Sequence, residues 1–554
     1  METKKILILL ELILIVTLAG FLRLYNLDNN PNGLYVDEAT TGYNAWSILE
    51  TGKDEYGKQF PLAFRFLGSY TPPLYTYLTA QVISVLGLSV YAIRFLSALA
   101  GIIMVPLFFI LLKKLNLIKD EKNILYASLL FAITPWAIFF SRIGYEVNLA
   151  FFLFSIGVLL LWQSIKNNYL LVVAAFLLGL SADTYHSERL LSPLLLIVSV
   201  IIFRKIFWKR KNLKILVISL LLYSIAVIPQ IIIIFTPANT TRGLGTFYFK
   251  AISNQVEISN LPPPVSWPVS ISYEFLSQYL SYFSPRNLFF QPDSDPQRSY
   301  PELSVFYPWM VVLYLIGIVV LTAHRNQLNS KFTIMLLLVC PIPAALTGDP
   351  FSTQRALPLL LPLMVVMSLG LEKVLSSFKF WPVILAVMIS FSLITLYRSG
   401  AVLFPNERAA VWGYGFSQLA SEIQKRPNEK FVIDTSRMKP AYIELAFYLK
   451  VSPQEVQNSV DQNIKNNYYH NTKWDSHYEL RNFETRQLNF EKDVYKPQIL
   501  VGDELSISDS QAAEHFLEKV FEIKDPLGQV IFKGYRSNPK KKCQTSSSKY
   551  CQNM

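Results

Sequence analysis

Long apolar runs alternate with short polar loops over the first 400 residues of the chain. A transmembrane helix needs roughly 17 to 25 mostly apolar residues, and the chain supplies many runs of that length without internal charges. The pattern predicts about eleven spans, with a margin of about two. They lie near 6–22, 92–112, 123–140, 147–165, 168–184, 190–206, 214–236, 306–323, 331–347, 356–372 and 380–398. The segment 74–90 fits either a span or a helix in the membrane plane.

The pattern changes after residue 398. Short apolar segments such as FVIDT, AYIELAFYLK, QILVGDE and QVIFKGYR follow one another, and AAEHFLEKVFEI has helical spacing. This alternation is typical of a small soluble α/β domain. The sequence therefore predicts a membrane domain over 1–398 and a soluble α/β domain with a polar tail over 399–554.

Composition supports a polytopic α-helical membrane protein. Hydrophobic residues make up 52% of the 554 residues and charged residues only 16%, whereas about a quarter of the residues are charged in an ordinary soluble protein. The net charge of +12 does not indicate nucleic-acid binding, because the basic residues cluster in short loops between spans, as lipid-surface and topogenic charges do.

Basic residues also predict the orientation. Lys4 and Lys5 precede the first span, and with eleven spans the same side receives the basic runs near 113–122, 204–214, 325–331 and 373–379. By the positive-inside rule this side is cytoplasmic. The first segment is expected to be an uncleaved anchor, because no small-residue cleavage site follows it. The outward loops are then 23–91 and 237–305, and the C-terminal domain also lies outside the cytoplasm.

The first outward loop carries two adjacent acids, Asp37 and Glu38, in GLYVDEATTGYNAW. Carboxylates close to a membrane surface are costly to desolvate, which favours a chemical role. The following residues have helical spacing, so Asp37 is also expected to cap a helix along the outer membrane surface, with Glu38 in its first turn. From the local sequence alone, capping is sufficient to explain both residues.

Other polar groups gather at the outward ends of the spans. They are Arg94, Arg142, Glu146, Asp183, His186, Glu188, Arg189, Asp349 and Arg355. Carboxylates and guanidiniums at one membrane face can form a cavity that holds an anion and activates a hydroxyl. Each also has a simpler explanation: Arg94 and Arg189 can extend from a span end to the interface, and Glu146 can pair with Arg142.

The second outward loop is rich in proline and aromatic residues. LPPPVSWPVS is proline-rich and YEFLSQYLSYFS has the spacing of an amphipathic helix. The loop fits a lid or sugar platform, and it equally fits a structural cover at the interface, where Trp and Tyr are common. Cys543 and Cys551 are spaced for a disulfide or are free thiols on a polar tail. Neither a metal site nor a cofactor is expected.

The order of these motifs resembles a known family. VDEATTGYNAWSILETG, YTPPLYTYLTA, YAIRFLSALAG, SRIGYEVN and STQRALPLLLPL are similar to segments of the bacterial and archaeal relatives of the dolichyl-phosphate-mannose protein mannosyltransferases. These relatives include the transferases that put aminoarabinose on lipid A; all belong to the GT-C superfamily, and the likeness is to glycosyltransferase family 39. It covers roughly residues 1–400.

The resemblance implies an inverting transfer of a sugar from a polyprenyl-phosphate carrier to a hydroxyl of a protein, lipid or glycan at the outer membrane face. Asp37 is then the general base, with Glu38 and Glu146 as further candidate catalytic residues. Arg355, Arg94, Arg189 and His186 are the candidates for binding the donor phosphate. Family members commonly have a charged residue, often lysine, before the proline pair, whereas Tyr70-Thr71 precedes Pro72-Pro73 here. Another cation, such as Arg65 or Arg355, can replace it, or the donor is held differently.

Two other functions fit a polytopic chain. A transporter or flippase of lipid-linked sugars usually has ionisable residues near the membrane midplane and repeated halves, and this sequence has neither. An inactive carbohydrate sensor would use the soluble domain, against which the retained Asp37-Glu38 pair argues. The sequence does not specify the sugar, the acceptor or the oligomeric state.

Overall fold

The computed structural model describes residues 2–209, 212–237, 247–259, 261–377, 380–437, 441–545 and 548–551. The chain divides into two compact units. The first unit contains residues 1–27, 71–75 and 94–402, and the second contains 28–70, 76–93 and 403–554. The second unit therefore combines most of the first outward loop with the whole C-terminal region.

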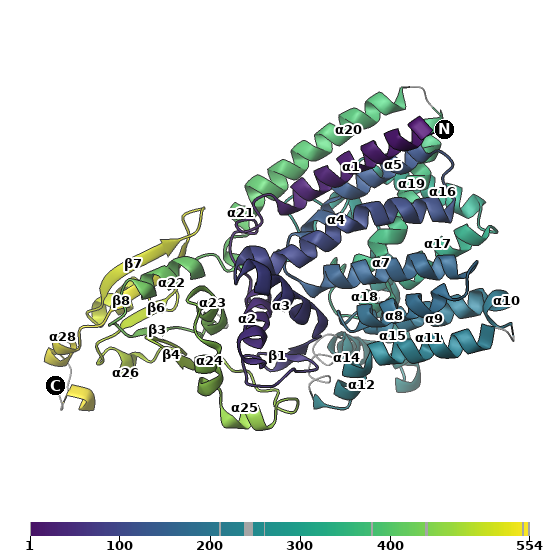
Figure 1. The fold of residues 1–554 in the computed structure, drawn as a ribbon. Helices are drawn as coiled ribbons and strands as arrows, with labels where there is room; N and C mark the ends of the chain where they lie inside the picture. Colours follow the sequence, from purple (N-terminus) through teal and green to yellow (C-terminus); the bar gives the residue numbers. More distant parts are fainter. Residues whose placement is uncertain are drawn as a thin grey trace. The chain divides into compact units, whose positions relative to one another are not determined.

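The first unit is helical, and its long helices run side by side (Figure 1). They are α1 (Glu2–Leu24), α4 (Val90–Leu115), α5 (Glu121–Ile133), α6 (Pro135–Ser141), α7 (Glu146–Ser164), α8 (Leu170–Ala182), α9 (Glu188–Ile202), α11 (Leu213–Ala226), α16 (Met310–Ala323), α17 (Leu328–Val339), α19 (Leu360–Ser377) and α20 (Trp381–Leu396). Shorter or outlying elements are α10 (Arg204–Phe207), α12 (Ile228–Ile233), α14 (Phe249–Ile258), α15 (Pro263–Ser281), η2 (Arg286–Phe290), α18 (Ile342–Ala345), η3 (Leu357–Leu359) and η4 (Tyr397–Leu403).

A helix occupies each of the eleven predicted ranges, but the helices differ in length. Among the described residues, six helices are long and apolar enough to cross a membrane, or seven if α5 and α6, bent by 52°, form one span. The six are Thr3–Leu24, Val90–Leu115, Glu146–Ser164, Leu328–Ala345, Leu357–Ser377 and Trp381–Glu407. A polytopic membrane fold is thus present, while the count of eleven spans remains a prediction. Helix α3 (Leu74–Leu86) is 13 residues long, about 20 Å, which favours a helix that does not span.

Two glycines bring α16 and α19 into close contact. A Cβ at Gly317 would stand 2.0 Å from the carbonyl oxygen of Val366, and a Cβ at Gly370 would stand 1.9 Å from that of Leu313. Small residues allow such backbone approach between membrane helices. Helix α19 is largely enclosed by protein, whereas α1 and α20 expose most of their apolar side chains, as expected for helices that face lipid.

Part of the second outward loop, residues 238–246 and 260, lies outside the described residues. The predicted amphipathic helix is present as α15, which begins earlier than expected, inside the proline-rich stretch. Proline fits the first turn of a helix because backbone N–H groups there have no acceptor within the helix, so the lack of one costs nothing. Helix α15 exposes Trp267, Ile271, Leu276 and Leu280. These side chains lie on opposite sides of the helix, and both interpretations of the loop stay predictions.

The second unit contains a mixed six-stranded sheet in the order β4-β5-β3-β6-β8-β7. The strands are β3 (Phe431–Ile433), β4 (Tyr478–Leu480), β5 (Phe483–Thr485), β6 (Ile499–Gly502), β7 (Glu518–Lys524) and β8 (Val530–Arg536). Strand β3 pairs in parallel with β5 and β6, and the outer pairs are antiparallel. The central strands are fully buried, so the predicted α/β character of the C-terminal region is present.

The other elements of the second unit lie in the first outward loop or in the C-terminal region. They are α2 (Val36–Thr51), β1 (Phe64–Phe66), β2 (Ser69–Thr71), most of α3, α21 (Phe404–Glu407), η5 (Ala410–Trp412), α22 (Phe416–Gln424), α23 (Ala441–Tyr448), α24 (Pro453–Ser459), α25 (Gln462–Asn466), α26 (Phe490–Asp493), α27 (Asp509–Glu514), α28 (Pro539–Gln544) and η6 (Lys549–Cys551).

The helix predicted over AAEHFLEKVFEI, residues 512–523, is wrong for most of its length. Helix α27 ends at Glu514, Phe516 adopts a positive φ of 54°, and the Leu517 N–H donates to the Ala512 carbonyl at 2.8 Å. This geometry terminates the helix. The following residues form β7, whose pairing with β8 outweighs the local helical spacing.

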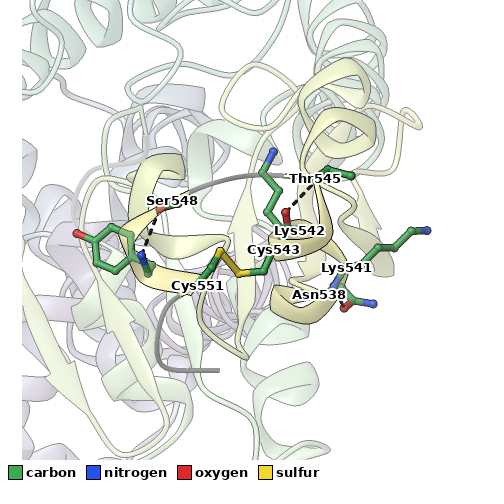
Figure 2. The surroundings of a disulfide bond; sticks show 8 residues. Asn538, Lys541, Lys542, Cys543, Thr545, Ser548 and Cys551 are labelled. Atoms are coloured by element: carbon green, nitrogen blue, oxygen red, sulfur yellow. Dashed lines mark hydrogen bonds between the residues drawn. A yellow bond between two sulfur atoms is a disulfide. The ribbon is translucent and has the colours of Figure 1, made fainter.

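The polar tail is closed by a disulfide between Cys543 and Cys551, with their Cα atoms 5.5 Å apart (Figure 2). Of the two alternatives that the sequence leaves open, the structure has the bonded one. The Tyr550 ring stacks on Tyr495, with ring centroids 5.9 Å apart. The bond therefore holds η6 against the sheet domain.

Candidate functional site

Asp37 and Glu38 lie in the first turn of α2. The helix begins at Val36 with Tyr35 as its N-cap, so the prediction that Asp37 caps the helix is wrong by two positions. The buried Glu38 carboxylate accepts the Tyr35 backbone N–H at 3.3 Å, which is the role of the third residue in a capping box. The capping box thus explains why an acid is present at position 38. Asp37 is the second residue of the helix, where the helix dipole favours a negative charge.

Helix α2 is held along its length by the C-terminal region. The Tyr43 hydroxyl donates to the Val451 carbonyl at 2.7 Å, and a Cβ at Gly42 would lie 3.3 Å from the Phe447 ring. The C-terminal end is closed by Gly52, whose positive φ of 68° lets its N–H bond to the Ile48 carbonyl. The backbone that carries Asp37 is therefore fixed by packing against α23.

A second acid pair, Asp54-Glu55, follows α2 and is fully buried. Glu55 accepts hydrogen bonds from the Asn44 amide at 3.0 Å and from the Tyr442 hydroxyl at 2.9 Å. Burial raises the pKa of Glu55 to about 8, although both donors oppose the shift. Burial likewise raises the pKa of Asp54 to about 7, and its main opposing donor is the Tyr468 hydroxyl.

Arg65 is also fully buried. It forms an ion pair with Asp475, Nη2 to Oδ1 at 2.9 Å, and donates to the carbonyls of Asn471 and Lys473. Its guanidinium is thus occupied by the C-terminal region. These partners use both terminal nitrogens of Arg65, which argues against Arg65 replacing the missing charged residue before the proline pair. Arg355 also pairs with a carboxylate, and its role stays a prediction.

These buried contacts tie the first outward loop to residues 442–475, and sequence reasoning missed them. A signal was present in KDEY, residues 53–56, where a second acid pair follows the helix. This acid pair alone did not indicate a buried hydrogen-bond network, because its partners, such as Tyr442, are nearly 400 positions away in the chain.

In the first unit, Arg94 and Arg142 gather around the end of α1. Arg94 is fully buried and donates to the Leu27 carbonyl at 2.9 Å. Arg142 donates to the carbonyls of Leu22, at 2.8 Å, and Tyr25, at 3.0 Å. Cations favour a helix C-terminus because its carbonyls lack partners. Arg94 thus does not extend to the interface, contrary to one expectation.

Glu146 is the first residue of α7 and is partly exposed, four positions after Arg142. It lies where the helix dipole favours an acid. His186 and Arg189 lie at the junction of α8 and α9, and the charge of Arg189 acts on Asp183. The Asp183 carboxylate also accepts from the Gln230 amide at 2.7 Å. The polar residues of this stretch thus form a separate group.

Arg355 precedes η3 and is three-quarters buried. Its Nη1 donates to Asp349 at 2.9 Å and to the Thr347 hydroxyl at 3.1 Å. Both hydrogen bonds use Nη1, so they orient the guanidinium without using its Nη2 and Nε donors. Asp349 also accepts from Arg298 Nη1 at 2.8 Å, which places two guanidiniums on one carboxylate.

Arg298 and Asp293 anchor this group and were not identified from the sequence. Asp293 is buried, and its carboxylate accepts the Thr353 hydroxyl at 2.8 Å and the Thr353 N–H at 3.0 Å. Burial raises the pKa of Asp293, opposed by the neighbouring Arg298. Thr353 stands two residues before Arg355, so these bonds fix the turn that presents it. The stretch QPDSDPQRSYP holds both anchors, but its composition indicated only a turn.

The predicted site residues thus fall into distinct groups. Asp37 and Glu38 belong to the second unit. The first unit contains the Arg94–Arg142–Glu146 group, the His186–Arg189 group and the Arg355–Asp349–Arg298 group. In the described ranges, the structure has no group of three or more His, Cys, Asp or Glu side chains arranged to hold a metal.

Solved structures provide the comparison. ArnT from Cupriavidus metallidurans, bound to undecaprenyl phosphate, matches with a TM-score of 0.53 at 12% identity, covering 94% of this chain and 97% of that chain. The archaeal oligosaccharyltransferase AglB from Archaeoglobus fulgidus, in complex with an inhibitory peptide and a dolichol-phosphate, matches with a TM-score of 0.50 at 12% identity, covering 97% and 74%.

No protein-family model and no curated protein matches the sequence. At 12% identity the structural likeness concerns the fold, and it extends over nearly the whole chain. The chain therefore shares its overall fold, a polytopic helical region with a C-terminal sheet region, with these two proteins.

Proposed function

We propose that the protein transfers a sugar from a polyprenyl-phosphate-linked donor to a hydroxyl of a protein, lipid or cell-envelope glycan at the outer face of the cell membrane. The observation that carries the proposal is the fold shared over 94% of the chain with ArnT bound to undecaprenyl phosphate. A polyprenyl tail adds about 0.8 kcal/mol of membrane affinity per buried CH₂, which suits an enzyme with apolar spans.

Arg355 is the best-supported donor-phosphate ligand. A guanidinium presents paired donors that fit phosphate oxygens. Asp349 and Thr347 orient it from one nitrogen, which lowers the entropy lost when it binds an anion. Arg94, Arg189 and His186 remain candidates for the same anion. Of these, Arg94 donates to a backbone carbonyl deep in the first unit, which favours a supporting role.

Asp37 is the proposed general base. It accepts the acceptor's hydroxyl proton while that oxygen forms a bond to the anomeric carbon. The bond from that carbon to the phosphate oxygen breaks, and the polyprenyl phosphate leaves with the electron pair. An attack opposite the leaving group inverts the anomeric centre. The leaving phosphate needs charge stabilisation more than protonation, which arginine provides. Glu38, engaged in capping, is then a positioning residue, and Glu146 orients the acceptor.

The proposed topology has a cytoplasmic N-terminus, with the active site and residues 399–554 on the other side. Functionally we keep the division into a GT-C domain over 1–398 and an extracytoplasmic domain over 399–554, although contacts join the latter to residues 28–70. The buried bonds of Glu55 and Arg65 support a role for the C-terminal domain in holding the loop that carries Asp37.

The test is a transfer assay with the purified full chain in lipid nanodiscs. A panel of polyprenyl-phosphate-linked sugars is compared with the corresponding nucleotide sugars, with hydroxyl acceptors from the cell envelope. The proposal expects product only from the lipid-linked donors. Transfer from nucleotide sugars alone, or movement of the intact lipid-linked sugar across the bilayer without product, would contradict it.

A further inference from the structure

An open cavity of about 560 Å³ lies in the second unit, apart from the groups described above. Its lining comes from α26 and the residues after it, from the end of α27, from α28 and from η6. These segments all belong to the C-terminal sheet domain. Ligand sites usually have roughly 300–1,000 Å³ and combine aromatic side chains with a few polar groups. The cavity therefore has the size of a site for a short oligosaccharide or another small ligand.

Aromatic rings line the cavity in two stacked pairs. Phe490 stacks on His515, with ring centroids 5.1 Å apart and an angle of 14° between the planes. Tyr550 stacks on Tyr495 at 5.9 Å. Tyr495 is buried in the core of the sheet domain, whereas Phe490, His515 and Tyr550 are partly exposed. The core thus supports these rings from behind, and part of their surface stays accessible to a ligand.

Partly exposed rings of this kind favour a sugar as the ligand. The face of an aromatic ring carries partial negative charge. The C–H bonds on one face of a pyranose carry partial positive charge, so the two faces stack while the sugar hydroxyls stay available for hydrogen bonds. A peptide bound through its backbone usually adds to a sheet edge, and the lining residues of this cavity include none from a strand.

Two lysines give the cavity an excess of positive charge. Lys492 and Lys542 line it together with one acid, Glu491. Neither lysine forms an ion pair with a residue in the described part of the chain, and the Lys542 ammonium donates to the Glu514 carbonyl at 3.2 Å. A carboxylate or phosphate on the ligand would form charge-assisted hydrogen bonds with such ammonium groups. The charges therefore favour an acidic sugar over a neutral one.

The disulfide holds one wall of the cavity in place. Lys542 directly precedes Cys543 (Figure 2), and Tyr550 directly precedes Cys551. The bond therefore fixes a lysine and an aromatic ring of the lining relative to each other. Disulfides persist in oxidising compartments, which agrees with the proposed extracytoplasmic location of this region. Glycans of the cell envelope are the acidic sugars of that compartment.

We propose that this cavity binds an acidic sugar residue of a cell-envelope glycan, a pyranose that carries a carboxylate or a phosphate. Tyr550 and the stacked pair of Phe490 and His515 contact the sugar ring. Lys492 and Lys542 bind the anionic group. The proposal concerns binding alone and does not depend on sugar transfer, so either can fail without the other. It gives the C-terminal domain a ligand of its own.

The test is calorimetry with the full chain in nanodiscs of neutral lipid and a tetrasaccharide that contains glucuronic acid. The matched ligand is the same tetrasaccharide with its carboxyl groups reduced to alcohols. We expect the reduced form to bind at least roughly fivefold more weakly, since one exposed ion pair changes an affinity by up to about fivefold. Tyr550→Ala should weaken binding of the acidic form roughly tenfold, through loss of stacking, and Lys542→Gln roughly threefold.

Two controls make the same chemical changes outside the cavity. Lys541→Gln removes the neighbouring lysine, which does not line the cavity, and Tyr169→Ala removes a tyrosine of the first unit that is 74% exposed. Both should bind the acidic tetrasaccharide like the wild type. The double variant Cys543→Ser with Cys551→Ser should lose affinity at least as strongly as Tyr550→Ala, because the wall formed by η6 is then released.

Three results would overturn the proposal. They are equal affinity for the acidic and reduced tetrasaccharides, no binding of either by the wild type, and an equal loss in the Lys541→Gln and Lys542→Gln variants. Glycerophosphoglycerol, the soluble headgroup of an anionic lipid, is measured in parallel. If it binds more tightly than the tetrasaccharide, the cavity is a lipid-headgroup site instead. If Tyr550→Ala lowers the melting temperature, the comparison of Lys542→Gln with Lys541→Gln still decides, because both replace a lysine side chain at the surface of α28.

Discussion

Removal of the Arg65 side chain should loosen the second unit strongly. The Arg65→Ala variant leaves Asp475, whose side chain is only 11% exposed, without its cation, and it leaves the carbonyls of Asn471 and Lys473 without their donor. Loss of one partner from a buried ion pair costs about 3–5 kcal/mol. That is a large share of the about 5–15 kcal/mol that stabilises a typical domain.

The second unit has roughly 200 residues, a size at which 1 kcal/mol shifts the melting temperature by about 2–4 °C. The variant should therefore melt about 6–20 °C below the wild type, measured by tryptophan fluorescence of the full chain in nanodiscs. Limited proteolysis should also cut residues 54–70 faster, because this segment loses its anchor to the C-terminal region.

Two variants separate the buried pair from a general charge effect. Lys425→Ala removes an exposed pair with Glu422, worth about 0–1 kcal/mol, and should melt within about 2 °C of the wild type. The double variant Arg65→Met with Asp475→Leu should recover part of the loss, since apolar residues can replace a buried ion pair. An Arg65→Ala chain that melts like the Lys425→Ala control would refute the reasoning.

Three further outcomes are expected. Arg355→Ala should weaken binding of a polyprenyl-phosphate donor by at least tenfold. Arg355→Lys should weaken it by less, because lysine keeps the positive charge but not the paired N–H donors of the guanidinium. Calorimetry with Arg398→Ala as the control measures this, and equal donor affinity in all variants would remove Arg355 from the site. Burial raises the pKa of Glu55 to about 8, so between the ordinary carboxyl pKa of about 4 and pH 8 the folded state binds a proton that the unfolded state has lost. The free energy of unfolding should therefore fall as the pH rises from about 5 to 8. The Glu55→Gln variant should reduce this pH dependence, and an unchanged dependence would contradict the reasoning. Gly370→Leu should separate α16 from α19 and lower the melting temperature of the first unit, because a Cβ at position 370 would stand 1.9 Å from the Leu313 carbonyl oxygen. A variant that melts at the wild-type temperature would argue against the close packing of α16 and α19.

The sequence predicted the positions of the apolar helices because these depend on local apolar length, while the count of eleven spans stays a prediction. It also located the α/β region, since FVIDT and QILVGDE form the buried strands β3 and β6. It failed where long-range pairing outweighs local spacing. Residues 518–523 have helical periodicity but pair with β8 as a strand, and only that partner decides between the two structures.

For the candidate site, the sequence identified residue types but not their partners. Asp37 was expected to cap α2, whereas Tyr35 is the N-cap and the Glu38 carboxylate accepts the Tyr35 backbone N–H. Arg65 was one of two cations suggested to replace the missing charged residue, but Asp475, more than 400 positions away, pairs with it. Arg298 and Asp293 support Arg355 from a stretch whose composition indicated only a turn. The base and phosphate-binding roles themselves stay predictions.

The most direct test of the central claim is single-turnover transfer by the Asp37→Asn variant, with bound lipid-linked donor quantified by native mass spectrometry. Asparagine keeps the shape of the side chain but cannot take a proton. The account predicts that the variant folds and binds the donor like the wild type, while general-base loss lowers transfer by at least 10²-fold. Transfer within a few-fold of the wild type, with Glu50→Gln as the unaffected reference, would contradict it.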